Sequence, residues 1–107
     1  MDYEDISPTE LAARIECGEA VNLIDVRELE EFELARIEAA RLLPLSRFDE
    51  WAKTLDPNEE LIFLCHHGMR SAHVCMRLAR EGFKNLRNLA GGIDRWSWDV
   101  DRNVPRY

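Results

Sequence analysis

The chain has 107 residues, of which 46% are hydrophobic and 33% are charged, and its formal net charge is −7. This length corresponds to about one small domain, so we expect a single domain over residues 1–107. The acidic balance argues against nucleic acid as a partner, because phosphate backbones attract basic surfaces. No apolar stretch approaches the ~20 residues that span a bilayer, and the acidic N-terminus lacks the basic start of a signal peptide. We therefore expect a cytoplasmic protein that does not contact membranes.

Three cysteines occur along the chain, Cys17, Cys65 and Cys75. Their odd number and their separations fit neither a disulfide framework nor the CxxC spacing of zinc sites. We expect free thiols, a reducing compartment and no metal. Cys75 falls on the apolar stripe of a predicted helix and is interpreted as a small hydrophobic residue, while the roles of Cys17 and Cys75 in any chemistry stay open.

Short apolar runs alternate with amphipathic segments, which is typical of βα units built around a mostly parallel sheet. The first helix is expected to begin after Ser7, whose hydroxyl can cap it, and to end near Gly18. A buried strand over residues 21–24 ends at Asp25. A short acidic helix follows over residues 29–35, with its acidic residues well placed for the helix dipole.

The most apolar strand of the chain is predicted over residues 61–64. Such an uninterrupted apolar run is expected for a strand that is covered on both faces. A short strand over residues 41–43 and a short helix through Trp51 precede it. The segments after it are a helix from about Ser71 to Glu81, a strand over residues 86–89 and a last helix that starts at Gly91-Gly92. We interpret the tryptophans as packing anchors, at Trp51, Trp96 and Trp98.

Cys65 directly follows the apolar strand and is the candidate reactive residue. The carboxyl ends of parallel strands form the ligand-binding edge of a sheet. Six residues later Ser71 begins the next helix, so the segment between them must turn tightly. Gly68 can adopt the left-handed backbone conformation that such a turn needs. A loop of this kind directs its N–H groups inward and ends on a helix N-terminus, and both features attract anions.

This loop is expected to favour a charged, nucleophilic thiolate at Cys65. Arg70 adds positive charge, and His66 and His67 add it when they are protonated. A thiolate in such surroundings is suited to covalent catalysis. The residues that we expect to form the active-site loop and to bind an anionic substrate are His66, His67, Gly68, Met69, Arg70 and Ser71.

Three segments, taken in chain order, resemble the signatures of rhodanese domains. Leu23-Ile24-Asp25-Val26-Arg27-Glu28, followed by Glu31-Phe32 and Ala35-Arg36-Ile37, is similar to the N-terminal signature. Cys65-His66-His67-Gly68-Met69-Arg70-Ser71 resembles the active-site loop, and Asn88-Leu89-Ala90-Gly91-Gly92-Ile93 resembles the C-terminal signature. The ending over residues 100–107 is similar to that of a subset of bacterial rhodanese-like proteins. The resemblance covers essentially the whole chain.

The resemblance implies a rhodanese-like α/β fold, with a five-stranded, mostly parallel sheet and helices on both faces. It also implies an enzyme of the thiosulfate sulfurtransferase type, in which Cys65 carries sulfur as a persulfide without a cofactor. The small anionic donor is expected to be thiosulfate or a persulfide, and the acceptor cyanide or a thiol, with a sulfur-relay protein as a further partner. The alternative is a non-enzymatic rhodanese module that binds a partner or senses redox state through Cys65.

The spacing between Cys65 and Arg70 separates sulfur transfer from phosphate chemistry. Related phosphatases resemble this fold but place five residues between the cysteine and the arginine, whereas four residues lie between them here. A shorter loop encloses a smaller anionic centre, which suits one sulfur atom better than a tetrahedral phosphate. Leu64 precedes Cys65, in place of the histidine of those phosphatases, and this also weakens the phosphatase interpretation.

Asp25 and Arg27 lie at the end of a predicted strand and are candidate supporting residues. A charged pair in this position is expected to shape loops by ion pairing and hydrogen bonding. Positive charge also lies along one predicted helix and its end, at Arg70, Arg77, Arg80 and Lys84. We interpret this charge as a solvated face, with docking of an acidic sulfur donor or acceptor protein as the alternative.

Overall fold

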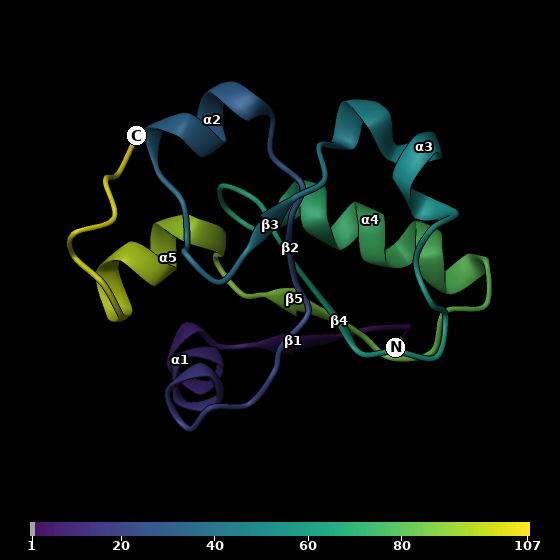
Figure 1. Cartoon of the computed structure of the whole chain (residues 1–107), viewed down its shortest axis with the longest axis horizontal. Coiled ribbons are helices and arrows are strands. Elements are labelled where there is room, and N and C mark those ends of the chain that lie inside the picture. The colour runs from purple at the N-terminus through teal and green to yellow at the C-terminus, as the bar shows by residue number, and fades with distance from the viewer. Residues whose placement is uncertain (1) are drawn as a thin grey trace.

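The computed structural model describes residues 2–107 as an α/β fold with one five-stranded sheet (Figure 1). The strands are β1 (Glu4–Ile6), β2 (Leu23–Asp25), β3 (Arg41–Leu42), β4 (Leu61–Leu64) and β5 (Leu86–Leu89). The helices are α1 (Pro8–Glu16), α2 (Leu29–Leu34), α3 (Phe48–Ala52), α4 (Met69–Arg80) and α5 (Gly92–Asp99), and a 3-10 turn spans Leu45–Arg47. None of these helices combines the length and the apolar character that crossing a membrane requires.

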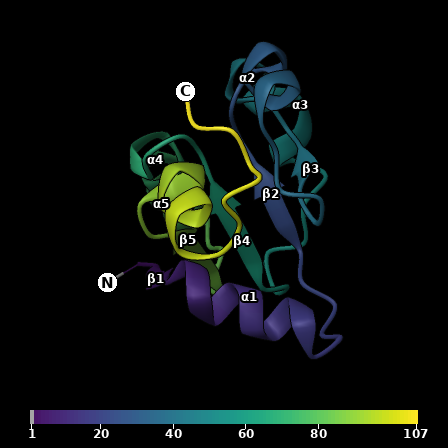
Figure 2. The same cartoon turned by 90° about the vertical axis from the view of Figure 1, so that its left-hand side faces the viewer.

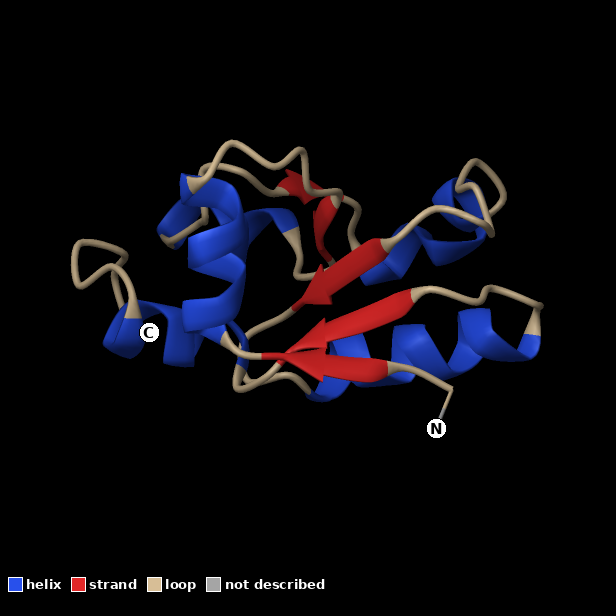
Figure 3. Cartoon of the chain, turned by 90° about the horizontal axis from the view of Figure 1, so that it is seen from below, coloured by secondary structure: helices blue, strands red, loops and turns tan. Residues whose placement is uncertain are grey.

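The sheet has the strand order β1-β5-β4-β2-β3, and all four pairings among residues 2–107 are parallel. Figure 3 shows the arrows of neighbouring strands pointing the same way. The expected five-stranded, mostly parallel sheet is therefore confirmed. β4 lies in the middle of the sheet with all four of its residues buried, as its uninterrupted apolar sequence predicts.

Helices cover both faces of the sheet, as expected. One core lies against α3 and α4 and includes Trp51, Phe63 and Val74. The other core lies against α1 and α5 and includes Ile62 and Trp96. Ile62 and Phe63 are neighbours on β4, so consecutive side chains of this strand enter opposite cores. Figures 1 and 2 show α1 on the opposite side of the sheet from α3 and α4.

The starts of two helices differ in how well the sequence locates them. The Ser7 hydroxyl accepts a hydrogen bond from the Glu10 N–H at 3.1 Å, so the predicted cap of α1 is confirmed. The expected start of α4 at Ser71 is wrong by two residues, since the helix begins at Met69. The cap position is taken by Gly68, whose φ of 102° lets the chain turn directly from the loop into the helix.

β1 is not predicted from the sequence. Among its three residues only Ile6 is buried, and Glu4 and Asp5 are exposed. The segment therefore lacks the apolar alternation that identifies a strand. It is a strand because its backbone pairs with β5, with Ile6 opposite Leu89, at the edge of the sheet.

Trp98 differs from the expected packing anchor. Its side chain is 41% exposed, and the guanidinium groups of Arg102 and Arg106 lie over its ring. Trp51 and Trp96 are buried, as expected. The exposed face of α5 thus carries an aromatic ring that is covered by cations rather than by the core.

Candidate active site

The carboxyl ends of the central strands bring the predicted site residues to one edge of the sheet. β2 ends at Asp25, which is opposite Leu64, the last residue of β4. Cys65 follows directly, and Asn88 lies near the end of the neighbouring β5. Residues that are far apart in the sequence therefore meet where parallel α/β sheets place their ligand sites.

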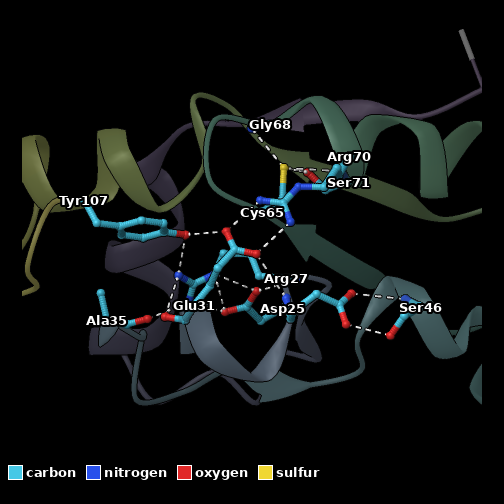
Figure 4. A network of polar contacts seen from close by, with 11 residues as sticks. Asp25, Arg27, Glu31, Ala35, Ser46, Cys65, Gly68, Arg70, Ser71 and Tyr107 are labelled. Atoms are coloured by element: carbon cyan, nitrogen blue, oxygen red, sulfur yellow. Dashed lines mark hydrogen bonds and ion pairs between the residues drawn. The ribbon is translucent and has the colours of Figure 1, made fainter. Parts of the chain in front are cut away.

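The Cys65 sulfur lies within the turn that leads into α4 and is surrounded by hydrogen-bond donors (Figure 4). Cys65 is only 1% exposed. Its Sγ accepts a hydrogen bond from the Gly68 N–H at 3.1 Å, and the Ser71 N–H lies at 3.4 Å. The Ser71 hydroxyl is also 3.4 Å from the sulfur. The two N–H groups, at the N-terminus of a helix, stabilise negative charge on the sulfur.

Asn88, on the neighbouring strand β5, holds the loop through two side-chain hydrogen bonds. Its side-chain carbonyl accepts a hydrogen bond from the Ser71 hydroxyl at 2.5 Å, and its amide donates to the Gly68 carbonyl at 3.0 Å. Because a serine hydroxyl has one proton, the bond to Asn88 fixes the direction of the Ser71 hydroxyl beside Cys65. No local pattern predicts this role of Asn88, which opens the segment 88–93 that resembles the C-terminal signature.

The N-terminus of α5 also holds this loop in place, through two backbone hydrogen bonds. The Ile93 N–H donates to the Cys65 carbonyl at 2.9 Å, and the Asp94 N–H donates to the His66 carbonyl at 3.1 Å. Gly92, with φ of 63°, lies so close that an added Cβ would be 2.5 Å from the Cys65 carbonyl oxygen. The glycine therefore permits the contact between two loops that positions Cys65.

We expect Gly92→Ala to lower the free energy of unfolding by more than about 2 kcal/mol, because backbone overlap adds to left-handed strain. Gly18→Ala is the matched control. Gly18 also has a left-handed φ, of 86°, but nothing lies within 4 Å of an added Cβ, so we expect a loss of about 1 kcal/mol. Urea unfolding measures both variants, and equal losses would show that close packing on the loop has no effect.

The other loop residues contribute in different ways. Met69 is 72% exposed and His67 is exposed, so the side chains of these predicted loop residues point away from the sulfur. The backbone N–H groups of His67, Met69 and Arg70 donate no hydrogen bond to any other group of residues 2–107. At this position the loop offers backbone donors for an anion, rather than the side chains of His67 and Met69.

Arg70 is placed differently from the expectation that its guanidinium holds the donor. Its two terminal nitrogens each donate to one carboxylate oxygen of Glu31, at 2.8 Å. This bidentate pair holds the pKa of Glu31 down at about 2, and a hydrogen bond from the Tyr107 hydroxyl also lowers it. Glu31 and Tyr107 lie in segments that resemble the family, but no local pattern predicts that they contact the loop. The same hydrogen bonds to Glu31, the largest cause, raise the pKa of Arg70 above its ordinary value.

A pH dependence of stability follows from Glu31. Its pKa is depressed in the folded state, so the stabilisation is fully present above the ordinary value of 4.5 and is lost as the pH falls toward about 2. We expect this pair to contribute about 1–2 kcal/mol after solvent screening. The free energy of unfolding is measured between about pH 6 and about pH 2, a range that spans both pKa values of Glu31. It should fall less on acidification in Glu31→Gln than in the wild type. Parallel curves would contradict the role of Glu31.

Asp25 and Arg27, the predicted supporting residues, form a fully buried ion pair (Figure 4). The Arg27 side chain donates to both carboxylate oxygens of Asp25, at 2.7–3.1 Å. It also donates to the carbonyl of Ala35 at 2.5 Å and to the Tyr107 hydroxyl at 2.8 Å. Among residues 2–107, no hydrogen bond joins either side chain to the Cys65 loop, so the pair shapes the segment that leads into and out of α2.

His66 lies against Tyr107, and their rings are stacked with centroids 4.0 Å apart. Burial, the largest cause, and the neighbouring His67 lower the pKa of His66. The imidazole is therefore mainly neutral near pH 7. The His66 and His67 rings pack on each other, with centroids 3.9 Å apart, and no group of metal-ligating side chains gathers among residues 2–107.

Cys17 and Cys75 occupy contrasting positions. Cys75 is buried in α4, and burial raises the pKa of its thiol to about 12. Its sulfur lies 3.6 Å from the Arg87 carbonyl, so Cys75 is a protonated core residue at neutral pH. Cys17 is exposed after α1, so reagents in solution can reach this thiol.

Two of the four basic residues predicted on α4 and at its end, Arg70 and Arg77, are paired. Arg77 lies 3.6 Å from Asp49 and 3.8 Å from Glu81, and its guanidinium packs over the Phe48 ring. Arg70 is held by Glu31, as described above. Arg80 and Lys84 are exposed and belong to no ion pair among residues 2–107, so the solvated face stays a prediction.

Comparison with known proteins agrees with this geometry. A family model for the Rhodanese-like domain matches residues 7–98 of the chain. The putative sulfurtransferase YtwF of Bacillus subtilis (strain 168) is 40% identical over 100 residues, which are 94% of this chain and 96% of that protein. The crystal structure of a rhodanese-like domain protein from Staphylococcus aureus superposes with a TM-score of 0.81 at 27% identity, and the match covers 98% of each chain.

Other relatives are longer than this chain. The putative sulfur carrier protein YrkF of Bacillus subtilis (strain 168) is 32% identical over 87% of this chain, which spans only half of YrkF. The chain spans still smaller shares of further curated relatives. The family match nevertheless covers most of the chain, and the structural match covers nearly all of it. The chain belongs to the rhodanese-like domain family.

Proposed function

We propose that the protein is a sulfurtransferase in which Cys65 accepts sulfane sulfur from an anionic donor and carries it as a persulfide. The observation that carries this proposal is the position of the Cys65 sulfur against the N–H groups of Gly68 and Ser71, at the N-terminus of α4. Such donors stabilise a thiolate and, equally, the anionic outer sulfur of a persulfide. The name of YtwF, a putative sulfurtransferase, supports the same class of reaction.

The proposed reaction has two half-reactions. In the first, the Cys65 thiolate attacks the sulfane sulfur of the donor, a new S–S bond forms, and the donor's own bond to that sulfur breaks. Sulfite leaves if the donor is thiosulfate, and a thiolate leaves if the donor is a persulfide. In the second, cyanide or an acceptor thiolate attacks the outer sulfur, and the Cys65 thiolate is regenerated. No external oxidant, metal or other cofactor is needed.

The unpaired N–H groups of His67, Met69 and Arg70 are available to bind the transferred sulfur or an anionic donor. The free thiols among residues 2–107 support a cytoplasmic, reducing setting. The relative YrkF is named a putative sulfur carrier, which supports a sulfur-relay protein as a further partner of this chain.

Initial-rate kinetics test the proposed persulfide intermediate. With thiosulfate and cyanide varied independently, transfer through Cys65 gives parallel double-reciprocal plots, because the first product leaves before the second substrate reacts. Cys17→Ser should give the same pattern, since this exposed thiol lies outside the loop. Intersecting plots would indicate direct transfer from donor to acceptor and would contradict the proposal.

A further inference from the structure

The two arginines around Cys65 are both neutralised by carboxylates (Figure 4). Arg70 commits both terminal nitrogens to Glu31. Arg27 is paired with Asp25, and both of these side chains are fully buried. Neither guanidinium therefore offers a free positive charge to an anion that enters the site.

The histidine next to Cys65 does not supply the missing charge. His66 is neutral near pH 7 because burial lowers its pKa. Its Nε2 is buried without a hydrogen-bond partner among residues 2–107. What remains beside the sulfur are the backbone N–H groups of the loop and the N-terminus of α4, which carry partial rather than full charges.

The Glu31 carboxylate is itself held in place. Oε2 accepts a hydrogen bond from the Tyr107 hydroxyl at 2.8 Å, and Oε1 accepts one from the Glu28 N–H at 3.2 Å. Tyr107 is fixed in turn by a hydrogen bond from Arg27 at 2.8 Å. An anionic donor must therefore compete with an anchored carboxylate for the guanidinium of Arg70.

We infer that Glu31 is a specificity-determining residue, which makes the site favour a thiol persulfide over thiosulfate as the sulfur donor. This inference rests on the proposed function. Thiosulfate is a dianion, so its reaction with the Cys65 thiolate gathers three negative charges. A persulfide in its protonated form, R–S–SH, brings the total negative charge of the reacting groups to one. Because Glu31 cancels the charge of Arg70, the site stabilises the second transition state better than the first.

The persulfide step balances without a further reactant. The Cys65 thiolate attacks the outer sulfur of R–S–SH and forms the Cys65–S–SH persulfide. The S–S bond of the donor breaks, and the thiolate R–S⁻ leaves with the bonding electrons. The proton stays on the transferred sulfur during the step and passes to solvent when the outer sulfur ionises, and the net charge of the reacting groups is −1 before and after the step.

The test compares the rates at which donors load sulfur onto Cys65, measured by intact mass. Thiosulfate and glutathione persulfide are each given to the wild type, Glu31→Gln and Glu30→Gln. Glu30 is an exposed neighbour on α2 without an ion pair among residues 2–107, and it serves as the matched control. Glu31→Gln should raise the thiosulfate rate about tenfold and change the persulfide rate less than about twofold. Glu30→Gln should change neither rate.

A second comparison shows whether Glu31 acts through Arg70. In Glu31→Gln/Arg70→Gln the gain with thiosulfate should vanish, because no guanidinium remains to be freed. Thermal unfolding of each variant confirms that it is folded at the assay temperature. A persulfide carried on a short cysteine peptide is compared with glutathione persulfide. The donor that loads Cys65 faster distinguishes a protein-borne persulfide from a small-molecule one.

The change in the ratio of the two donor rates decides the outcome, because the intrinsic reactivity of each donor cancels between variants. An unchanged ratio in folded Glu31→Gln would overturn this inference and leave the proposed function intact. A gain that persists in the double variant would also overturn it. Failure of every donor to load the wild type would instead overturn the proposed function.

Discussion

Replacing Arg27 by Met is expected to lower the free energy of unfolding by about 3–5 kcal/mol. Arg27 and Asp25 are both fully buried. A methionine fills much of the same volume but leaves the Asp25 carboxylate uncompensated in the protein interior. It also removes the hydrogen bonds to the Ala35 carbonyl and the Tyr107 hydroxyl, so α2 and the C-terminal segment lose a shared anchor.

Urea unfolding measures this loss, and two variants make it specific. Arg41→Met removes an exposed arginine from β3 and should change stability by less than about 0.5 kcal/mol. Asp25→Asn combined with Arg27→Met should recover part of the loss, because the buried charge is gone while an oxygen remains to accept the backbone N–H of residue 27. A stability of Arg27→Met close to that of the wild type would contradict the structural role of the pair.

Replacing Cys65 by Ser is expected to reduce sulfur transfer at least about a thousandfold. The serine hydroxyl stays protonated near neutral pH and cannot form the S–S bond that carries the sulfur. The substitution is nearly isosteric, and the donors from Gly68 and Ser71 can still be satisfied by an oxygen acceptor. The variant should therefore remain folded, and its loss should be one of chemistry.

The other two cysteines provide controls for this result. Cys17→Ser should keep turnover within about twofold of the wild type, because Cys17 is exposed and remote from the loop in the chain. Cys75 should resist alkylation at neutral pH, because burial raises its pKa to about 12. Turnover of Cys65→Ser near the wild-type rate would mean that sulfur travels by another route.

Segments with a strong local pattern could be predicted from the sequence. The apolar run of β4 indicates a strand that is buried on both faces, and that position places Cys65 at the carboxyl edge of the sheet. Gly68 indicates the tight turn, and it does adopt a left-handed conformation. The resemblance to rhodanese domains supplied the number of strands, which local patterns alone could not give because β1 is short and largely exposed.

The residues that contact Arg70 could not be predicted, because these contacts join distant parts of the chain. Glu31 lies 39 residues before its partner Arg70, and Tyr107 lies 76 residues after Glu31. No periodicity or spacing connects positions so far apart, and each residue alone fits a solvated surface. The sequence therefore predicts that the charge of Arg70 binds an anion, whereas in the folded protein Glu31 neutralises this charge.

Intact mass spectrometry of the sulfur-loaded protein tests the central claim most directly. In a Cys17→Ser background, incubation with thiosulfate or glutathione persulfide should add the mass of one sulfur atom, and cyanide should remove it. Adding Cys65→Ser to this background should abolish the gain. A protein that stays unmodified with both donors, or one that gains the same sulfur without Cys65, would contradict the assignment of Cys65 as the sulfur carrier.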